Sequence, residues 1–135
     1  AKRALGKLGA KRIGYLAPYI SEISAQMCAD FEADGFAVGA AATFGEGRDS
    51  VVGRISPSSI MSALDALAES AAGGIDAIFV SCTSLKCASI IAAAEAELGI
   101  PVISSNSALA WDMARLANVH VGGPVNGAGK GMLFA

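Results

Sequence analysis

Charged residues and metal-binding residues are scarce in this sequence. Charged residues make up 16% of the 135 positions, and there are only three cysteines and one histidine. Three cysteines are too few, and odd in number, for a disulfide framework, and the histidine lies too far along the chain from them to complete a metal site. We therefore expect reduced thiols and no bound metal ion.

Long apolar runs and basic clusters are also lacking. No stretch reaches the roughly 18 to 20 apolar residues that span a bilayer. Residues 1–12, AKRALGKLGAKR, are typical of a basic amphipathic helix and have no apolar centre of the signal-peptide kind. The net charge of −2 provides no basic face for nucleic acid. These features predict a cytoplasmic protein that binds neither membranes nor nucleic acid.

What the chain has in excess is apolar character. Hydrophobic residues make up 53% of it, and its length suits one domain with a single core. An apolar fraction this high predicts that part of the surface faces a partner. We expect either self-association or contact with a further lobe of the same protein.

Short apolar runs alternate with segments of helical period four times. The runs cover residues 12–18, 36–44, 75–81 and 100–104. The third, IDAIFVS, is continuously apolar, as in strands that are buried on both faces of a parallel sheet. The pattern predicts an α/β fold with a parallel, flavodoxin-like sheet of about four strands and helices on both faces. Residues 1–135 are expected to form one lobe.

The helical segments carry apolar stripes and recognisable ends. In the first, Ile20, Ile23, Met27 and Phe31 share a face. In the second, Ser56 is the expected N-cap, with Pro57 at the first helical position. Its expected buried stripe consists of Ile60, Leu64, Leu67 and Ala71. The third is expected to start directly after the third strand, with Cys87 about one turn inside it. Ser105 and Asn106 are the expected N-cap of the last.

Ligands of open parallel sheets bind beyond the carboxyl ends of the strands. The residues that follow the four predicted strands are therefore the candidates for a site. They are Pro18 and Tyr19, then the loop 45–50 with Asp49, then Ser81, Cys82, Thr83 and Ser84, and finally Ser104, Ser105 and Asn106.

Cys82 is the candidate with the greatest chemical potential. A thiol between a strand and the start of a helix lies near the positive end of the helix dipole, which favours the thiolate. Thr83 and Ser84 add hydroxyls and backbone N–H groups that could hold a carboxylate, and Tyr19 could donate a phenolic hydrogen bond to it. The alternative is a cysteine that packs as a small hydrophobe. Asp49 is either a ligand contact or a turn-forming residue.

Taken together, the motifs resemble a known family. GYLAPY, FGEGRDSVVGRISPSSI, DAIFVSCTSLK, AELGIPVISSNSALAWDMARLA and GKGMLF occur in the order found in the aspartate/glutamate racemase superfamily. The similarity covers nearly the whole chain. It is greatest to the branch that contains maleate cis-trans isomerases, arylmalonate decarboxylases and ectoine-utilisation proteins.

The resemblance implies a cofactor-independent enzyme built from two similar lobes, of which this chain is similar to the second. It implies that Cys82 is the catalytic cysteine and that Tyr19, Thr83 and Ser84 bind the substrate carboxylate. Asp49 lies where maleate isomerases tend to carry asparagine. The partner thiol of such a site would belong to the first lobe.

The leading hypothesis is therefore a racemase- or isomerase-like enzyme. It would act next to the carboxylate of a small acid or amino acid, with Cys82 as acid, base or nucleophile. The alternatives are a decarboxylase of the arylmalonate type and a noncatalytic or truncated lobe that binds a small carboxylate or a partner chain.

Overall fold

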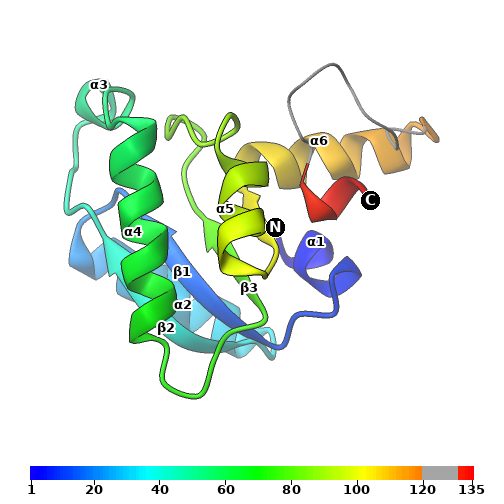
Figure 1. Ribbon diagram of the computed structural model, residues 1–135, viewed down its shortest axis with the longest axis horizontal. Helices are drawn as coiled ribbons and strands as arrows, with labels where there is room; N and C mark the ends of the chain where they lie inside the picture. The colour runs from blue at the N-terminus through cyan, green and yellow to red at the C-terminus, as the bar shows by residue number, and fades with distance from the viewer. Residues whose placement is uncertain (120–130) are drawn as a thin grey trace.

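The computed structural model describes residues 1–119 and 131–135; His120 and the glycine-rich stretch that follows it lie outside the described residues. Four parallel strands form one sheet in the order β2-β1-β3-β4 (Figure 1). They are β1 (Arg12–Ala17), β2 (Ala37–Thr43), β3 (Ala77–Val80) and β4 (Val102–Ser104). Each lies within one of the four predicted runs, so the predicted parallel sheet is confirmed.

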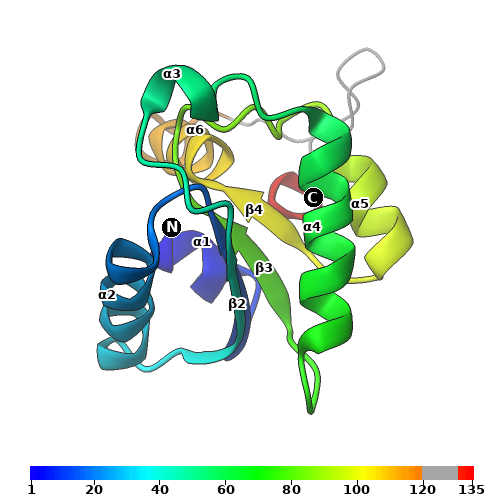
Figure 2. The same cartoon turned by 90° about the vertical axis from the view of Figure 1, so that its left-hand side faces the viewer.

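Helices cover both faces of the sheet (Figure 2). One face carries α1 (Lys2–Lys7), α2 (Ser21–Ala33), α6 (Ser105–Leu116) and the short 3-10 helix η1 (Met132–Phe134). The other carries α4 (Pro57–Ser70) and α5 (Ile91–Leu98). The four-residue α3 (Asp49–Val52) lies beyond the carboxyl ends of the strands, at the top of Figure 2. This is the predicted α/β arrangement.

Two apolar cores follow from the alternation of side chains along the strands. Ile13, Tyr15 and Phe79 point into the core beneath α1, α2 and α6. Leu16 and Val80 point into the core beneath α4 and α5. Because the central strands β1 and β3 are buried on both faces, each is almost continuously apolar.

The expected start and buried stripe of the second helix are confirmed. The Ser56 hydroxyl accepts a hydrogen bond from the Ser59 N–H at 3.1 Å, and Pro57 is the first helical residue. The predicted stripe is buried along its whole length and consists of Ile60, Leu64, Leu67 and Ala71.

The predicted stripe of α2 is wrong in its first half. Ile20 and Ile23 are 42% and 48% exposed, whereas Ser24 and Phe31 are buried. Ile20 is the N-cap and precedes the helix. The face that meets the sheet runs from Ser24 through Cys28 to Phe31, so polarity alone gave the wrong rotation of this helix.

The N-cap of the last helix is also one residue earlier than predicted. The Ser104 hydroxyl accepts from the Ser107 N–H at 3.0 Å, while the Ser107 hydroxyl accepts from the Ser104 N–H at 2.8 Å. This reciprocal pair is a capping box. It frees the Asn106 side chain for a different contact, described below.

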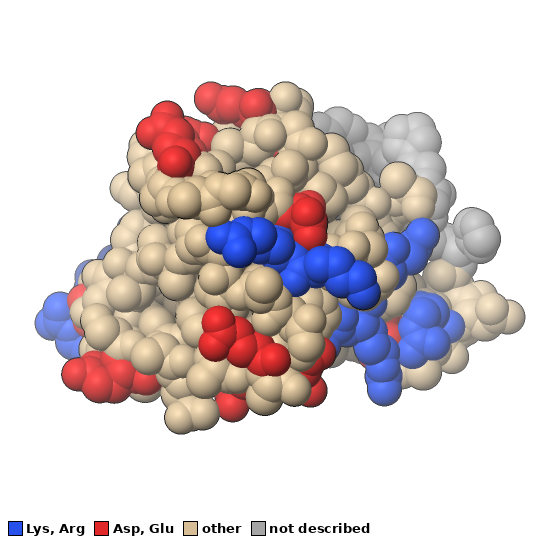
Figure 3. All heavy atoms as spheres, turned by 90° about the horizontal axis from the view of Figure 1, so that it is seen from below, with Lys and Arg blue, Asp and Glu red and all other residues tan. Residues whose placement is uncertain are grey.

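The surface at the amino ends of the strands carries charges of both signs. Figure 3 shows lysine and arginine side chains in a band across this face, with acidic side chains on both sides of it. Asp76 accepts hydrogen bonds from the N–H groups of Lys11 and Arg12, at 2.8 and 2.7 Å.

Within the described residues, no helix has both the length and the apolarity needed to cross a membrane.

A buried carboxylate joins the last strand to the end of the chain. Glu95 is 4% exposed and accepts hydrogen bonds from two backbone N–H groups, those of Val102 at 2.9 Å and Met132 at 2.8 Å. Burying a carboxylate is costly unless it is hydrogen-bonded. The two bonds meet that requirement and hold the segment 131–135 against α5 and β4.

Glu95→Ala should lower the free energy of unfolding by about 3 kcal/mol, because it leaves two backbone N–H groups without their charged acceptor. Glu95→Gln keeps one acceptor oxygen and should cost less. Glu97→Ala, an exposed position on the same helix, is the matched control and should be close to neutral. Urea denaturation followed by circular dichroism measures all three; equal stability of Glu95→Ala and Glu97→Ala would contradict the role given to Glu95.

Candidate functional site

The order of the strands reverses at β1 and β3, at the carboxyl edge of the sheet. From β1 the chain turns outward to β2, and it then returns to form β3 on the other side of β1. The loops that leave β1 and β3 therefore diverge, which is where ligands bind in sheets of this order. Leu16 pairs with Val80 across the two strands, so the residues that follow them, Tyr19 and Cys82, emerge side by side.

Cys82 has an unusual backbone conformation. Its φ is +86°, one of only two positive values among non-glycine residues in the described part of the chain. Such a conformation is unfavourable for a residue with a Cβ and is concentrated at functional sites. The side chain is 8% exposed and packs in the core cluster that contains Leu16 and Leu85. Packing therefore explains the burial of Cys82 but not its conformation.

The segment after Cys82 is a loop, which corrects the predicted position of the next helix. Helix α5 begins only at Ile91, so its N-terminus does not directly follow Cys82 and Cys87 lies outside it. Leu85 and Cys87 are buried and fix the loop on the sheet. The predicted effect of this helix dipole on the thiol therefore has no basis in the structure.

Two backbone N–H groups follow Cys82 where the N-terminus of a helix was expected. Within residues 1–119 and 131–135, the N–H groups of Thr83 and Ser84 donate no hydrogen bond. The Thr83 carbonyl accepts from the Asn106 side chain at 3.0 Å, which ties the loop to the first turn of α6. Successive N–H groups beside a residue with positive φ can bind an anion where they converge, so these two groups are candidates for such a contact.

Tyr19 is held in place through its main chain. Its carbonyl accepts hydrogen bonds from the hydroxyls of Thr43 and Ser24, the latter at 3.5 Å. The Thr43 hydroxyl in turn accepts from the Gly45 N–H at 3.0 Å, so the loops after β1 and β2 are joined. The side chain is half-buried and packs against both cores at the edge of the sheet. Sequence reasoning missed Thr43, whose place at the end of the second strand was the available signal.

The phenol of Tyr19 is suited to donate a hydrogen bond. Burial raises its pKa above the ordinary value of 10. The Ser81 hydroxyl lowers this pKa, whereas the nearby Cys82 and the charge of Asp49 raise it further. A phenol with a raised pKa keeps its proton at neutral pH.

The remaining predicted residues lie around this centre. Asp49 is exposed and is the first residue of α3. A Cβ on Gly53, which follows α3, would lie 3.9 Å from the Ser84 carbonyl oxygen, so the loop after β3 runs next to this helix. Thr83 is exposed and Ser84 is half-buried. The structure thus gathers all five predicted residues at one edge of the sheet.

The other two cysteines have environments that favour the neutral thiol. Burial raises the pKa of Cys87. Burial, and to a lesser extent the charge of Glu32, raises the pKa of Cys28. Neither thiol is activated in this structure, because the thiolate is the nucleophilic form.

The cationic side chain of the loop 45–50 is already paired. Arg48, in the neighbouring loop, is paired with Glu46 through contacts of 2.9 and 3.0 Å, and this pairing lowers the pKa of Glu46 to about 2. The described residues contain no group of three or more His, Cys, Asp or Glu side chains placed to hold a metal ion.

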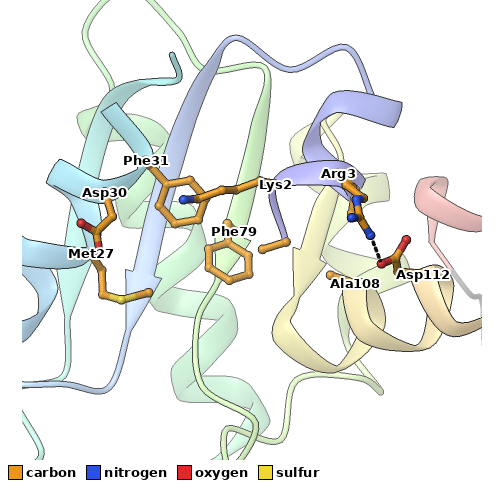
Figure 4. Close-up of a pocket in the computed structure, with 10 residues that line it drawn as sticks. Lys2, Arg3, Met27, Asp30, Phe31, Phe79, Ala108 and Asp112 are labelled. Carbon is orange, nitrogen blue, oxygen red and sulfur yellow. Dashed lines mark hydrogen bonds and ion pairs between the residues drawn. The ribbon is translucent and has the colours of Figure 1, made fainter. Parts of the chain in front are cut away.

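A separate cavity of about 380 Å³ lies between α1, α2 and α6 (Figure 4). Phe31, Phe79 and Met27 form its apolar part. Lys2 lies over the Phe31 ring, 5.8 Å from its centre, and Arg3 pairs with Asp112 at 2.9 Å. None of the predicted site residues lines this cavity.

The conformation of Cys82 yields a test that is independent of activity. At ordinary positions alanine is more stable than glycine by roughly 0.5 to 1 kcal/mol. At a φ of +86° glycine carries no strain, so Cys82→Gly should be at least as stable as Cys82→Ala. Urea denaturation of the two variants measures the difference. A clear advantage of the alanine variant would show that Cys82 does not adopt this conformation.

Comparison with known proteins identifies relatives for this arrangement. The family model described as arylmalonate decarboxylase matches residues 2–134. A maleate isomerase from Nocardia farcinica is 30% identical over 127 residues, 93% of this chain and 49% of the relative. An arylmalonate decarboxylase from Bordetella bronchiseptica is 29% identical over 130 residues, 96% of this chain and 52% of the relative.

Solved structures agree with these matches. A crystal structure of arylmalonate decarboxylase superposes with a TM-score of 0.84 at 26% identity, over 98% of this chain and 57% of that one. The Nocardia farcinica maleate cis-trans isomerase, as a cysteine-to-serine mutant with a covalently bound succinylcysteine intermediate, gives a TM-score of 0.87 at 28% identity, over 98% and 51%. The chain spans about half the length of the curated relatives it matches. It belongs to the arylmalonate decarboxylase family, in the branch of the aspartate/glutamate racemase superfamily that includes the maleate isomerases.

Proposed function

We propose that this chain supplies the catalytic cysteine of a cofactor-independent isomerase that acts next to the carboxylate of a small acid such as maleate. The observation that carries the proposal is the conformation of Cys82, held at a φ of +86° beside Tyr19 where the loops after β1 and β3 diverge. The relatives named maleate isomerase, one of them with a succinylcysteine intermediate, support the choice of substrate.

The chemistry needs only a thiolate and a way to hold negative charge. The sulfur adds to one carbon of the double bond, and the π electrons move to the other carbon and into its carboxylate. The former double bond is then single and can rotate. When the electron pair re-forms the double bond, the S–C bond breaks, and the thiolate leaves together with the trans product. No electron acceptor and no net proton transfer are required.

The neighbours of Cys82 have matching roles in this proposal. Tyr19 keeps its proton and donates it in a hydrogen bond to a substrate carboxylate. The free N–H groups of Thr83 and Ser84 bind the carboxylate on which charge accumulates, and such preorganised donors are the usual stabilisers of an oxyanion. Asp49, exposed at the rim, could approach the second carboxylate of maleate only through its backbone N–H, because two carboxylates repel each other.

We propose further that residues 1–135 correspond to the second of two lobes. The half-length matches support this, as does an apolar stripe on α6. Leu109, Met113 and Leu116 recur at helical spacing and are 57%, 60% and 68% exposed. A first lobe or a second copy of the chain would cover them. Self-association, a cytoplasmic location and a link to ectoine utilisation remain predictions from the sequence.

The test is a covalent one, so that it does not require turnover by half an enzyme. The purified chain is incubated with maleate, and intact mass spectrometry detects an increase equal to one added maleate. Peptide mapping should place the addition on Cys82. Formation of fumarate is followed in the same samples by proton NMR.

Cys82→Ser should abolish both the adduct and any fumarate while leaving the circular dichroism spectrum unchanged. Cys28→Ser is the matched control and should keep full adduct formation, because the Cys28 thiol is not activated. An adduct that persists in Cys82→Ser would overturn the assignment. Calorimetric binding of maleate with neither adduct nor fumarate would favour a noncatalytic carboxylate-binding lobe.

A second candidate activity is decarboxylation of an arylmalonate, favoured by the family model that matches nearly the whole chain. There the substrate would lose CO₂ to give a planar enediolate, and the Cys82 thiol would transfer its proton to the α-carbon. Release of CO₂ from phenylmalonate, with no isomerisation of maleate, would select this activity.

A further inference from the structure

The hydroxyl of Tyr15 is buried below the carboxyl edge of the sheet. Tyr15 is fully buried in the core beneath α1, α2 and α6, and its ring lies 6.2 Å from those of both Phe31 and Phe79. Its phenolic oxygen has no hydrogen-bond partner among the described residues. A buried polar group in this state is costly, and phenylalanine would fill the same space without that cost.

The strand register shows what lies above this hydroxyl. Tyr15 pairs with Phe79 across β1 and β3, so their side chains share a face of the sheet. Ser81 is two residues beyond Phe79, and its N–H still donates to the Leu16 carbonyl at 2.7 Å, so the strand geometry continues to it. The Ser81 side chain is therefore on the Tyr15 face, one step closer to the carboxyl edge of the sheet.

Ser81 is itself buried, at 3% exposure, and neighbours both phenols. Burial raises the pKa of Tyr15 to about 12; the nearby Ser81 hydroxyl opposes this rise, although the two oxygens do not meet hydrogen-bond geometry in the structure. The same hydroxyl lowers the pKa of Tyr19. A hydroxyl with a single proton can stabilise only one phenolate at a time. Tyr15 lies on the core side of Ser81, and Tyr19 lies at the carboxyl edge of the sheet.

We propose that Tyr15 and Ser81 are positioning residues that form a buried relay and aim the Tyr19 hydroxyl at the carboxylate bound beside Cys82. Tyr15 donates to Ser81, and Ser81 consequently donates to the Tyr19 oxygen. The Tyr19 proton is left for the substrate, because Ser81 is no longer free to accept it. Chains of this kind polarise each successive donor. The carboxylate at the end of the relay rests on the proposed function, whereas the relay itself does not.

The chain contains only two tyrosines, Tyr15 and Tyr19, which makes a direct test practical. Labelling with [ζ-¹³C]tyrosine gives two signals, and Tyr15→Phe assigns them by removing one. Ser81→Ala should raise the pKa of Tyr19 by about one unit, because the phenolate loses a hydrogen-bond donor. Tyr15→Phe should raise it by less, because Ser81 is then less polarised. Ser70→Ala removes a hydroxyl bonded to the Leu67 carbonyl in α4 and is the matched control, with no expected change.

The stability of Tyr15→Phe shows whether the Tyr15 hydroxyl positions Tyr19 or instead holds the fold together. Tyr15→Phe should be close to the wild type in its resistance to urea, because the loss of one hydrogen bond to Ser81 is offset by no longer burying a hydroxyl in an apolar core. An unchanged Tyr19 signal and pKa in both Ser81→Ala and Tyr15→Phe would overturn the relay. So would a marked loss of stability in Tyr15→Phe, because the hydroxyl would then have a structural role.

A second arm concerns the ligand. Maleate should shift the Tyr19 signal and, through Ser81, the Tyr15 signal, and the Tyr15 response should disappear in Ser81→Ala. Maleate that moves Tyr19 but leaves Tyr15 unchanged in the wild type would overturn the relay. A complete lack of response to maleate would contradict the proposed substrate, and the ionisation measurements would still decide on the relay.

Discussion

The direct pairing of β1 with β3 is the constraint on which the site depends. Because Tyr15 lies opposite Phe79 and Leu16 opposite Val80, the two strands end at the same height and release Tyr19 and Cys82 side by side. A shift of one residue in this register would turn every side chain of one strand to the opposite face. Such a shift would exchange the aromatic side chains of one core for the aliphatic side chains of the other, and the close packing of both cores opposes that exchange.

The same register places an aromatic core on one face of the sheet near Cys82 and an aliphatic core on the other. The thiol of Cys82 packs towards the aliphatic core that contains Leu16 and Leu85, whereas Ser81 turns towards the aromatic core. Ser81 continues the alternation of β3 and therefore lies on the same face as Phe79. The positive φ of Cys82 ends that alternation, and the cysteine packs with Leu16 and Leu85.

The sequence predicted the elements of the fold well and their finer geometry less well. Four apolar runs and the Ser56–Pro57 start signal located the strands and α4, because burial on both faces and N-capping leave strong local marks. The rotation of α2 was wrong because Ile23 is apolar but exposed, and the small Ser24 was buried in its place. The start of α5 was misplaced because buried loop residues such as Cys87 have the same apolar character as helix residues.

For the candidate site, the sequence predicted which residues gather at the carboxyl edge of the sheet but not their backbone geometry. A helix dipole was expected to act on Cys82, yet α5 starts only at Ile91, and Cys82 leads instead into a loop in which the Thr83 and Ser84 N–H groups donate no hydrogen bond to the described residues. A φ of +86° leaves no mark in the sequence, because the conformation of a loop depends on contacts between residues that are far apart in the chain. Here the buried Leu85 and Cys87 anchor the loop on the sheet, and the Asn106 side chain donates to the Thr83 carbonyl at 3.0 Å. Such contacts exist only in the folded chain, so the residue types at this edge could be predicted from the sequence whereas their backbone geometry could not.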